Sequence, residues 1–460
     1  MINKFDLIVI GSGSGLDVAS GLAERGFNVA IIEKNKLGGT CLNVGCIPSK
    51  LLIHSADIIQ LIKKAEVFGV NVKNYSINYQ KIVNRVNNIV DNDSEKIKKG
   101  LQQVENPKLF LGECKFIGEK KIIVGKNITL TANKILIAAG ARPSIPKIKG
   151  LDKVNFITSN EALRLKKLPK ILTIIGGGYI ACELAYFFGS LGTKINIIQR
   201  SDKLISREDI DIARKFTRIF SRKYNIYLGY NAEYVSKITE KGKKSFYVLA
   251  YNKHGKKLEL LSDQLLVATG RIPNSDLLNI EKTNVKVDKK GFIKVNKYLE
   301  TNVKGIFALG DIVGRYQFKH NSNNEAYYAF NNILYPEKQK VVNYTAMPHA
   351  IFSSPQIAGV GFTEQDLKKM DIQYIKSRYP FLQTGMGKAI EDRDGFVKFL
   401  IGKSSRKILG CHIIGTEASI LIHEVLVAMK SAGKIDNINN TIHIHPSLSE
   451  VVQRAASITI

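Results

Sequence analysis

Two segments of this chain share one pattern, an apolar run of strand length followed by glycines and a helical stretch. The first, at residues 5–15, reads FDLIVIGSGSG, and the second, at 171–181, reads ILTIIGGGYIA, so that their first glycines lie 165 residues apart. In such a strand–turn–helix the glycines let the backbone approach a pyrophosphate, and the helix N-terminus attracts its charge. One glycine-rich loop is weak evidence, but two in matching context are strong. The pattern therefore predicts two dinucleotide-binding units.

Length and composition exclude several other classes of protein. The chain has 460 residues, 44% of them hydrophobic, which suits a globular protein of several domains. No apolar run reaches the ~18 residues of a membrane-spanning helix, and the N-terminus lacks the cleavage site of a signal peptide. Five cysteines are too few for a disulfide-stapled secreted fold. We therefore expect a cytoplasmic protein with no membrane partner.

The charge of the chain is strongly positive. Lysine and arginine number 68 against 40 acidic residues, a net charge of +28. Such a charge attracts polyanions or an acidic partner. The lysines are spread along the whole chain, however, and no RNA-binding module accompanies them. We therefore favour a compositional bias and regard nucleic-acid binding as the less favoured alternative.

Three further apolar runs end in turns, at residues 135–140, 265–270 and 305–311. Ligands of open α/β sheets bind at the carboxyl ends of strands, so these turns are candidate ligand contacts. Between residues 91 and 133 we expect short strands alternating with turns, as in a small insertion.

The last third of the chain has a different pattern. Residues 395–401 and 408–414 are typical of antiparallel strands, and residues 416–433 of a helix that ends at Gly433. We therefore predict an α/β chain with two Rossmann-like units and a C-terminal α+β domain. The predicted segments are 1–145 and 271–338 for the first unit, 146–270 for the second, and 339–460 for the last domain.

An acidic residue follows the first glycine turn at the sequence spacing typical of a ribose-binding carboxylate. Glu33 lies 20 residues after Gly13, where a carboxylate accepts hydrogen bonds from a ribose 2′-OH. The third glycine of the G-x-G-x-x-G pattern is replaced by Leu16, so we expect looser packing of this helix on its strand.

The second turn has the accepted third residue, Ala181, but a different ribose end. Gln199 and Arg200 stand there, with no acid. An arginine without an acid accommodates the 2′-phosphate of NADP. Arg200, with Lys203 or Arg207 nearby, is therefore a candidate reader of that phosphate, and the alternative is a solvated arginine on a basic protein.

Cys41 and Cys46 form a Cys-x4-Cys pair at the start of a helix-like run. Thiols at a helix N-terminus have lowered pKa values, and two such thiols can cycle between dithiol and disulfide. Half of a structural zinc site is the alternative, but the other cysteines supply no second pair. We interpret these others, Cys114, Cys182 and Cys411, as buried apolar residues.

His443 and His445 stand close to the C-terminus, with Glu450 following. Histidine titrates in the range needed to take a proton from an incoming thiol, and a carboxylate can orient it. The motif alone predicts a metal site or a surface loop about as well.

Taken together, these residues resemble the pyridine nucleotide–disulfide oxidoreductases, a family of flavoproteins. The resemblance rests above all on GGTCLNVGCIPSK at residues 38–50, and it covers the whole chain. The other matching segments, besides the first glycine turn, are Ala139–Pro143, Gly176–Glu183, Ala268–Asn274, Ala308–Asp311 and His445–Glu450.

The resemblance implies FAD on the first unit, NAD or NADP on the second, and a redox-active disulfide between Cys41 and Cys46. Cys46 is the implied thiolate against the flavin, and Cys41 the thiol that exchanges with substrate. His445, held by Glu450, is the implied acid–base group. In this family the histidine reaches the disulfide of the other subunit, so a homodimer is implied.

Further site residues follow from the same resemblance. Lys50 is implied to lie near the flavin and pair with Glu183, and Asp311 to touch the ribityl chain. No metal is implied. The other implied cofactor contacts are Gly11, Gly13, Gly15, Glu33, Gly112, Ala139, Gly140, Gly176, Gly178, Tyr179, Ile180, Gln199, Arg200, Gly270, Arg271 and His320.

Within the family, the cysteine run looks most like that of the dihydrolipoamide dehydrogenases. This implies a small dithiol substrate of the lipoamide type, with a 2-oxoacid dehydrogenase complex as a candidate partner. Gln199 and Arg200 argue against it, and residues 316–325 look more like mycothione reductase. An NADPH-dependent reductase of low-molecular-weight disulfides is therefore one alternative, and a basic docking flavoprotein is another. A tail without cysteines argues against mercuric and large thioredoxin reductases.

Overall fold

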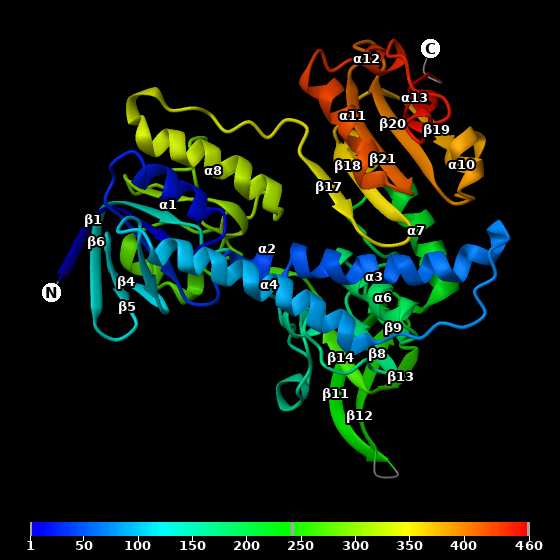
Figure 1. Cartoon of the computed structure of the whole chain (residues 1–460), viewed down its shortest axis with the longest axis horizontal. Helices are drawn as coiled ribbons and strands as arrows, with labels where there is room; N and C mark the ends of the chain where they lie inside the picture. The colour runs from blue at the N-terminus through cyan, green and yellow to red at the C-terminus, as the bar shows by residue number, and fades with distance from the viewer. Residues whose placement is uncertain (1, 241–242, 458–460) are drawn as a thin grey trace. The chain divides into compact units, whose positions relative to one another are not determined.

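The computed structural model describes residues 2–240 and 243–457 (Figure 1). Contacts divide the chain into two compact units, each built from three segments. Unit 1 comprises Met1–Leu51, Gln80–Ser144 and Gly270–Asn343, and unit 2 comprises Leu52–Tyr79, Ile145–Thr269 and Tyr344–Ile460. The domain limits expected from the sequence stay a prediction.

Unit 1 is built on one large sheet. Its first strands are parallel, and β16 (Ile306–Ala308) adds to β6. Leu7, Ile8 and Val9 of β1 are fully buried, as expected of a parallel strand covered on both faces. Helices α1 (Gly15–Ala23) and α8 (Lys319–Leu334) pack against each other (Figure 1). The strand order is β3 (Lys108–Leu111), β2 (Val29–Glu33), β1 (Ile2–Ile10), β6 (Ile128–Ile137), β5 (Lys121–Val124) and β4 (Cys114–Gly118).

Helix α4 corrects the prediction of short strands from residue 91 onward. It spans Tyr79–Gln102, and strands begin only at β3, which belongs to the main sheet. One face of α4 is buried at a helical spacing by Val83, Val86, Val90, Ser94 and Leu101. The prediction was wrong up to residue 102, because a helix whose exposed face carries asparagine and lysine continues to that point. It is confirmed from residue 108 on, where the short strands β3, β4 and β5 alternate with turns.

The first part of unit 2 repeats the strand–turn–helix plan. Its parallel sheet has the order β10 (Asn225–Leu228), β9 (Lys194–Gln199), β8 (Ile171–Ile175) and β14 (Gln264–Val267). Helix α6 (Tyr179–Ser190) follows β8, and α7 (Ile210–Lys223) joins β9 to β10. Before β14 the chain forms an antiparallel excursion of β11 (Tyr230–Glu240), β12 (Lys243–Asn252) and β13 (Lys257–Ser262).

The C-terminal part of unit 2 is α+β, as predicted. Helices α11 (Ala418–Lys430) and α13 (Glu450–Ser457) pack on an antiparallel sheet (Figure 1). The sheet has the order β17 (Pro348–Ile351), β18 (Gln356–Gly361), β21 (Ile408–Gly415), β20 (Phe396–Gly402) and β19 (Tyr374–Pro380). The predicted fold class, two Rossmann-like units with a C-terminal α+β domain, is confirmed.

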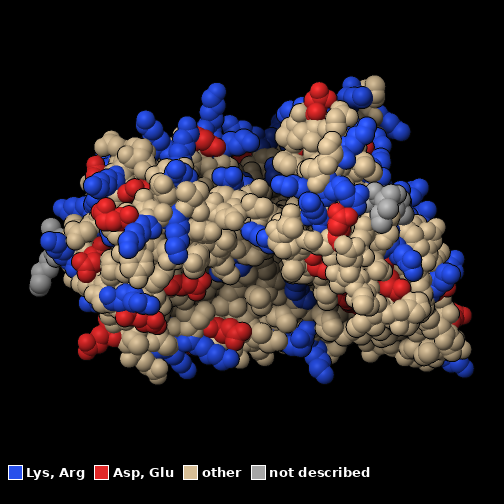
Figure 2. All heavy atoms as spheres, turned by 90° about the horizontal axis from the view of Figure 1, so that it is seen from above, with Lys and Arg blue, Asp and Glu red and all other residues tan. Residues whose placement is uncertain are grey.

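Basic side chains are scattered over the face that Figure 2 shows, with acidic side chains between them. Within the described residues, no helix combines the length and the apolar character needed to cross a membrane.

A row of side chains crosses the C-terminal sheet, one from each of four neighbouring strands. In register, the row is His349, Gly359, His412 and Lys398. Glycine is needed in this row because a Cβ at residue 359 would lie 2.6 Å from His349 Cε1. The row therefore brings two imidazole rings and one ammonium group onto a single face of the sheet.

Lys398 is fully buried and binds three carboxylates. Its Nζ lies 2.7 Å from Asp209 and 2.7 Å from Asp211, at the start of α7, and 2.6 Å from Glu364. Glu364 begins α9 (Glu364–Lys369). Burial opposes ionisation of Glu364, but hydrogen bonds from Lys398 and Lys368 outweigh it and lower its pKa to about 2. The cluster ties α7 to the C-terminal sheet.

Replacing Lys398 by methionine should destabilise the protein by about 3–5 kcal/mol, because buried carboxylates lose their cation. The matched control is Lys376→Met, which removes a half-exposed partner of the same Glu364 at 3.3 Å and should cost under about 1 kcal/mol. Denaturant unfolding at neutral pH measures both.

The contribution of this ion pair to the stability of the folded protein should decrease as the pH is lowered. Because the folded pKa of Glu364 lies below its ordinary value, the ion-pair contribution is complete above about pH 4.5 and is lost toward about pH 2. The stability difference between wild type and Lys398→Met should shrink over this range. Equal stability of the two proteins at neutral pH would contradict the role given to Lys398.

Candidate functional site

The two glycine turns have the same backbone geometry. Gly11 N–H donates to the carbonyl of Ile32 at 2.8 Å, and Gly176 N–H donates to Ile198 at 2.9 Å. Both glycines have positive φ, 103° and 112°. A Cβ on either would lie 2.4 or 2.3 Å from a carbonyl oxygen just after the neighbouring strand, at Ala138 or Ala268. Only glycine fits at these two points.

The packing of α1 corrects the expectation drawn from Leu16. A Cβ on Gly15 would lie 2.8 Å from Val9 Cγ1 and 2.9 Å from Ala138 Cβ. The close contact between helix and strand is therefore made by Gly15, one residue before the expected position. Leu16 is half-buried and does not loosen the turn.

The equivalence of the turns relates the two positions that the sequence analysis predicts to lie at a ribose. The carbonyls of Ile32 and Ile198 accept the equivalent hydrogen bonds from the two turns. The next residues, Glu33 of the first unit and Gln199 of the second, therefore correspond to each other. Glu33 accepts from Ser12 Oγ at 2.7 Å and from the backbone N–H groups of Ser12 and Asn35. Gln199 is buried and donates to the Lys203 carbonyl at 3.3 Å, whereas Arg200 is exposed.

The cradles formed by these turns fit dinucleotides. A Cβ on Gly140, Gly178 or Gly270 would meet nothing within 4 Å, so backbone faces open space at each turn. Arg271 Nε is buried without a hydrogen-bond partner, 3.5 Å from Asp311. Burial raises the pKa of Asp311, and Arg271 opposes that shift. A partly buried pair of opposite charges in the unit that carries the first turn suits FAD in unit 1, and the turn of unit 2 suits NAD(P).

Other predicted contacts border these turns. Asn274 supports Gly140 by donating its backbone N–H to the Gly140 carbonyl and its side-chain Nδ2 to the Ala139 carbonyl, at 3.1 and 2.7 Å. Gly112 N–H donates to the Glu33 carbonyl at 2.8 Å. Tyr179 and Ile180 begin α6, and the exposed His320 stacks on Phe318 with ring centres 5.2 Å apart.

Cys41 and Cys46 lie on two consecutive short helical stretches. Cys41 belongs to α2 (Gly39–Val44) and is half-buried, and Cys46 is the exposed first residue of α3 (Cys46–Lys64). Both are free thiols joined by a hydrogen bond. This contact and burial raise the pKa of Cys41, and the charge of Lys319 opposes the shift. The two thiols therefore have different environments.

Asn43, which lies between the cysteines, is a structural residue that the sequence analysis missed. Its buried amide donates to the carbonyls of Lys36, Leu37 and Gly39 at 3.2, 2.8 and 3.0 Å. Ser94 of α4 adds a bond to Leu37 at 2.8 Å. These bonds fix the loop that carries Cys41, and only its place between the cysteines could have indicated the role.

The two C-terminal histidines have different environments. The His443 side chain is 6% exposed and contacts Glu424 at 3.1 Å, whereas that of His445 is 75% exposed. His445 Nδ1 lies 2.8 Å from buried Glu450, whose other oxygen accepts from Ser447 N–H. The His445 hydrogen bond lowers the pKa of Glu450. Nε2 of His445 is therefore the ring nitrogen that is not directed at Glu450.

Within the described part of the chain, no group of three histidine, cysteine or acidic side chains could hold a metal ion. Lys50 and Glu183 lie in different units, so their pairing stays a prediction. Lys50 donates to Ser49 at 3.3 Å, and buried Glu183 accepts from Phe352 N–H at 3.0 Å.

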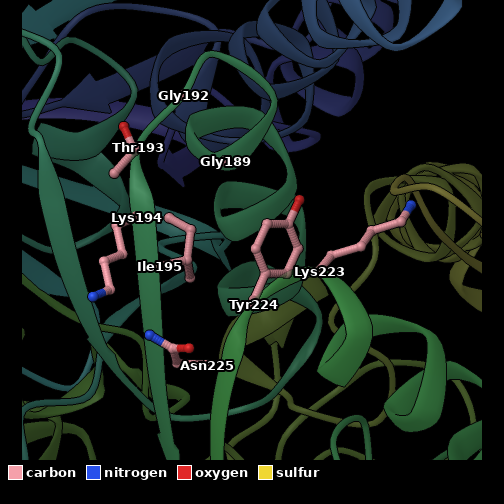
Figure 3. Close-up of a pocket in the computed structure, with 8 residues that line it drawn as sticks. All are labelled: Gly189, Gly192, Thr193, Lys194, Ile195, Lys223, Tyr224 and Asn225. Atoms are coloured by element: carbon pink, nitrogen blue, oxygen red, sulfur yellow. The ribbon is translucent and has the colours of Figure 1, made fainter. Parts of the chain in front are cut away.

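Figure 3 shows a pocket at the amino end of β9. Ligands of an open parallel sheet bind at the carboxyl ends of its strands. The pocket lies at Lys194, the first residue of β9, whereas the predicted nucleotide contact Gln199 is the last residue of that strand. The pocket is therefore separate from the second glycine turn. It is lined by Gly189, Gly192, Thr193, Lys194, Ile195, Lys223, Tyr224 and Asn225.

Comparison with known families decides what this arrangement is. Residues 5–326 match the family model of pyridine nucleotide-disulphide oxidoreductases, and residues 347–456 match the dimerisation domain of the same family. The chain belongs to this family. As a pyridine nucleotide-disulphide oxidoreductase it is an enzyme that uses FAD and NAD(P), and its dimerisation domain supports a homodimer.

Relatives extend over the full length of the chain. It is 33% identical to the dihydrolipoyl dehydrogenase of Buchnera aphidicola, covering 98% of this chain and 95% of that one. It is 32% identical to the dihydrolipoyl dehydrogenase of Chlamydia trachomatis, covering 100% and 98%. Among solved structures, the Cu(II) complex of the HOCl-induced flavoprotein disulfide reductase RclA from Escherichia coli matches with a TM-score of 0.88 at 27% identity, covering 99% of both chains.

The thiol pair of this oxidoreductase gives a direct prediction. Replacing Cys46 by alanine in the reduced protein should lower the pH midpoint for alkylation of Cys41 by about one unit or more. The reason is that the hydrogen bond and charge that raise the pKa of Cys41 are removed. Mass spectrometry after brief alkylation at a series of pH values measures this midpoint.

The control is Cys114→Ala, which removes a buried thiol outside the pair and should leave the midpoint of Cys41 unchanged. A midpoint that stays in place in Cys46→Ala would show that the two thiols are not coupled.

Proposed function

We propose that this oxidoreductase is a dihydrolipoyl dehydrogenase, which oxidises the dithiol of dihydrolipoamide and passes the electrons to a pyridine nucleotide. The observation that carries the proposal is the coupled pair Cys41 and Cys46, held by Asn43, together with full-length relatives of that name. A cytoplasmic location and a 2-oxoacid dehydrogenase complex as partner are part of the proposal.

The chemistry of the chain's own residues follows from the site. With Cys41 and Cys46 oxidised, His445 Nε2 takes a proton from one substrate thiol, and the thiolate attacks Cys41 Sγ. The disulfide breaks, Cys46 leaves as a thiolate, and Cys41 is bonded to the substrate. The second substrate thiol then attacks the substrate sulfur of this mixed disulfide. The proton of the second thiol passes to the departing Cys41 Sγ, so Cys41 leaves as a thiol, His445 keeps the first proton, and the substrate departs as a disulfide.

The structure supports the division of labour between the thiols. The raised pKa of Cys41 favours its release as a thiol, which leaves the negative charge on Cys46. Bound FAD supplies the redox chemistry that accepts the electron pair and relays it to NAD(P). Glu450 holds His445 in one orientation through its hydrogen bond to Nδ1.

A second candidate, an NADPH-dependent reductase of low-molecular-weight disulfides, is favoured by one observation. Gln199 occupies the position that corresponds to Glu33, so no carboxylate stands at that position to repel a 2′-phosphate. Steady-state assays with lipoamide, using NADH and NADPH in parallel, separate the two candidates. Fast lipoamide turnover supports the dehydrogenase, and slow turnover despite rapid flavin reduction supports the reductase.

The nucleotide preference can be shifted by design. Gln199→Glu combined with Arg200→Ala should raise the ratio of kcat/KM for NADH to that for NADPH by roughly tenfold to a hundredfold, because a carboxylate now faces the 2′-position. The control Arg222→Ala removes an exposed arginine from the far end of α7. An unchanged ratio in the double variant would show that Arg200 does not read the phosphate.

Hybrid dimers test whether His445 serves the other subunit. Cys46→Ser and His445→Ala homodimers should each lose nearly all disulfide turnover, by roughly 10²-fold or more. A hybrid of the two retains one intact site if cysteines and histidine come from different subunits, and none if they come from the same subunit. Turnover that appears when differently tagged variants are co-expressed measures this, and an inactive purified hybrid would contradict the proposal.

A further inference from the structure

Lys319, the first residue of α8, has an unusual environment for a lysine. It is half-buried, and its Nζ donates to Ser14 Oγ at 2.8 Å. Among the described residues, no carboxylate forms an ion pair with it. A cation drawn partly out of water needs compensating charge, and a hydroxyl supplies little.

Ser14 places this cation on the first glycine turn. Ser14 is the residue just before α1, and its side chain does not cap that helix but donates to Asn323 Oδ1 at 2.9 Å. Its hydroxyl is thus bound between Lys319 and Asn323 of α8. Lys319 Nζ therefore stands at the N-terminus of α1, where a dinucleotide pyrophosphate binds.

Two further observations describe the surroundings of Lys319 and of the glycine turn. Gln317 Nε2, two residues before Lys319, is buried without a hydrogen-bond partner. A Cβ on Gly39 would lie 2.7 Å from Gly13 Cα, so the loop that leads to Cys41 lies directly on the glycine turn. The charge of Lys319 acts on Cys41 across this contact. Lys319 is thus a cation beside both the glycine turn and the dithiol.

We propose that Lys319 is a further FAD-binding residue, whose ammonium group contacts the pyrophosphate above the Ser14 turn. The proposal rests on the FAD site of the proposed function. Backbone N–H groups and the helix dipole supply partial charges at such a turn, and Lys319 adds a full one. This explains why α8, a helix far from the turn in sequence, begins with a lysine directed at Ser14.

Release of FAD from the holoenzyme tests the proposal without relying on turnover. Lys319→Met should release FAD roughly tenfold to a hundredfold faster at low salt, because one charged hydrogen bond to phosphate is lost. Lys319→Arg should stay close to wild type. The fluorescence of free flavin after rapid dilution measures the rate. Added KCl should accelerate release strongly in wild type and weakly in Lys319→Met.

The matched control lies at the other end of the same helix. Lys134 is also half-buried and donates to the Ile333 carbonyl at 2.7 Å, so Lys134→Met should leave FAD release unchanged. Lys319→Gln repeats the test with a polar side chain should the methionine variant fold poorly. The salt dependence of wild type is a test that needs no variant.

The outcomes distinguish the possible failures. Wild type that purifies without FAD would contradict the cofactor assignment itself. Equal release from wild type and both Lys319 variants would overturn the proposal while leaving the FAD site intact. Unchanged release together with a raised pH midpoint for Cys41 alkylation would overturn it too, and would assign Lys319 to the dithiol.

Discussion

Each of the two nucleotide-binding sheets depends on the same constraint, the close approach of a glycine to a carbonyl oxygen. Gly11 lies against Ala138, and Gly176 against Ala268, at distances that exclude any side chain. This approach lets the chain leave the end of one strand, cross its neighbour and enter a helix within a few residues. The helix N-terminus then points at the space where a pyrophosphate binds. The fold and the cofactor site are consequences of the same contact.

The redox site combines this geometry with electrostatics. A hydrogen bond between Cys41 and Cys46 makes the two thiols unequal before any ligand binds, since it raises the pKa of Cys41. Asn43 fixes the loop through three carbonyls, so the inequality does not depend on a mobile segment. His445 and Glu450 repeat the principle, because a buried carboxylate orients an exposed imidazole. In both places a fixed partner sets the environment of one side chain of the proposed site.

Charge is used differently in the core and on the surface. Lys398 gathers three carboxylates where water is excluded, and this cluster joins α7 to the C-terminal sheet. Lys319 is half-buried without a carboxylate and stands where an anion is expected. The scattered surface lysines form no comparable arrangement on the face of Figure 2. The net charge of +28 is therefore less informative than the position of two lysines.

The sequence determined the features that depend on local pattern. Apolar runs and glycines marked β1, β8 and both turns, and the spacing of Cys41 and Cys46 marked the redox pair. The sequence analysis did not predict helix α4, because its apolar face is narrow and its other face is rich in asparagine and lysine.

Only the tertiary structure decided the contacts between residues distant in the chain. Gly15, and not residue 16, makes the close contact between helix and sheet, because Val9 of β1 and Ala138, just after β6, both approach it. Lys398 meets Asp209 across 189 residues, and Lys319 meets Ser14 across 305. No local pattern encodes such pairs, because each depends on where packing places a whole helix or strand. The sequence thus determined which chemistry the chain carries, and the packing decided which residues hold and tune it.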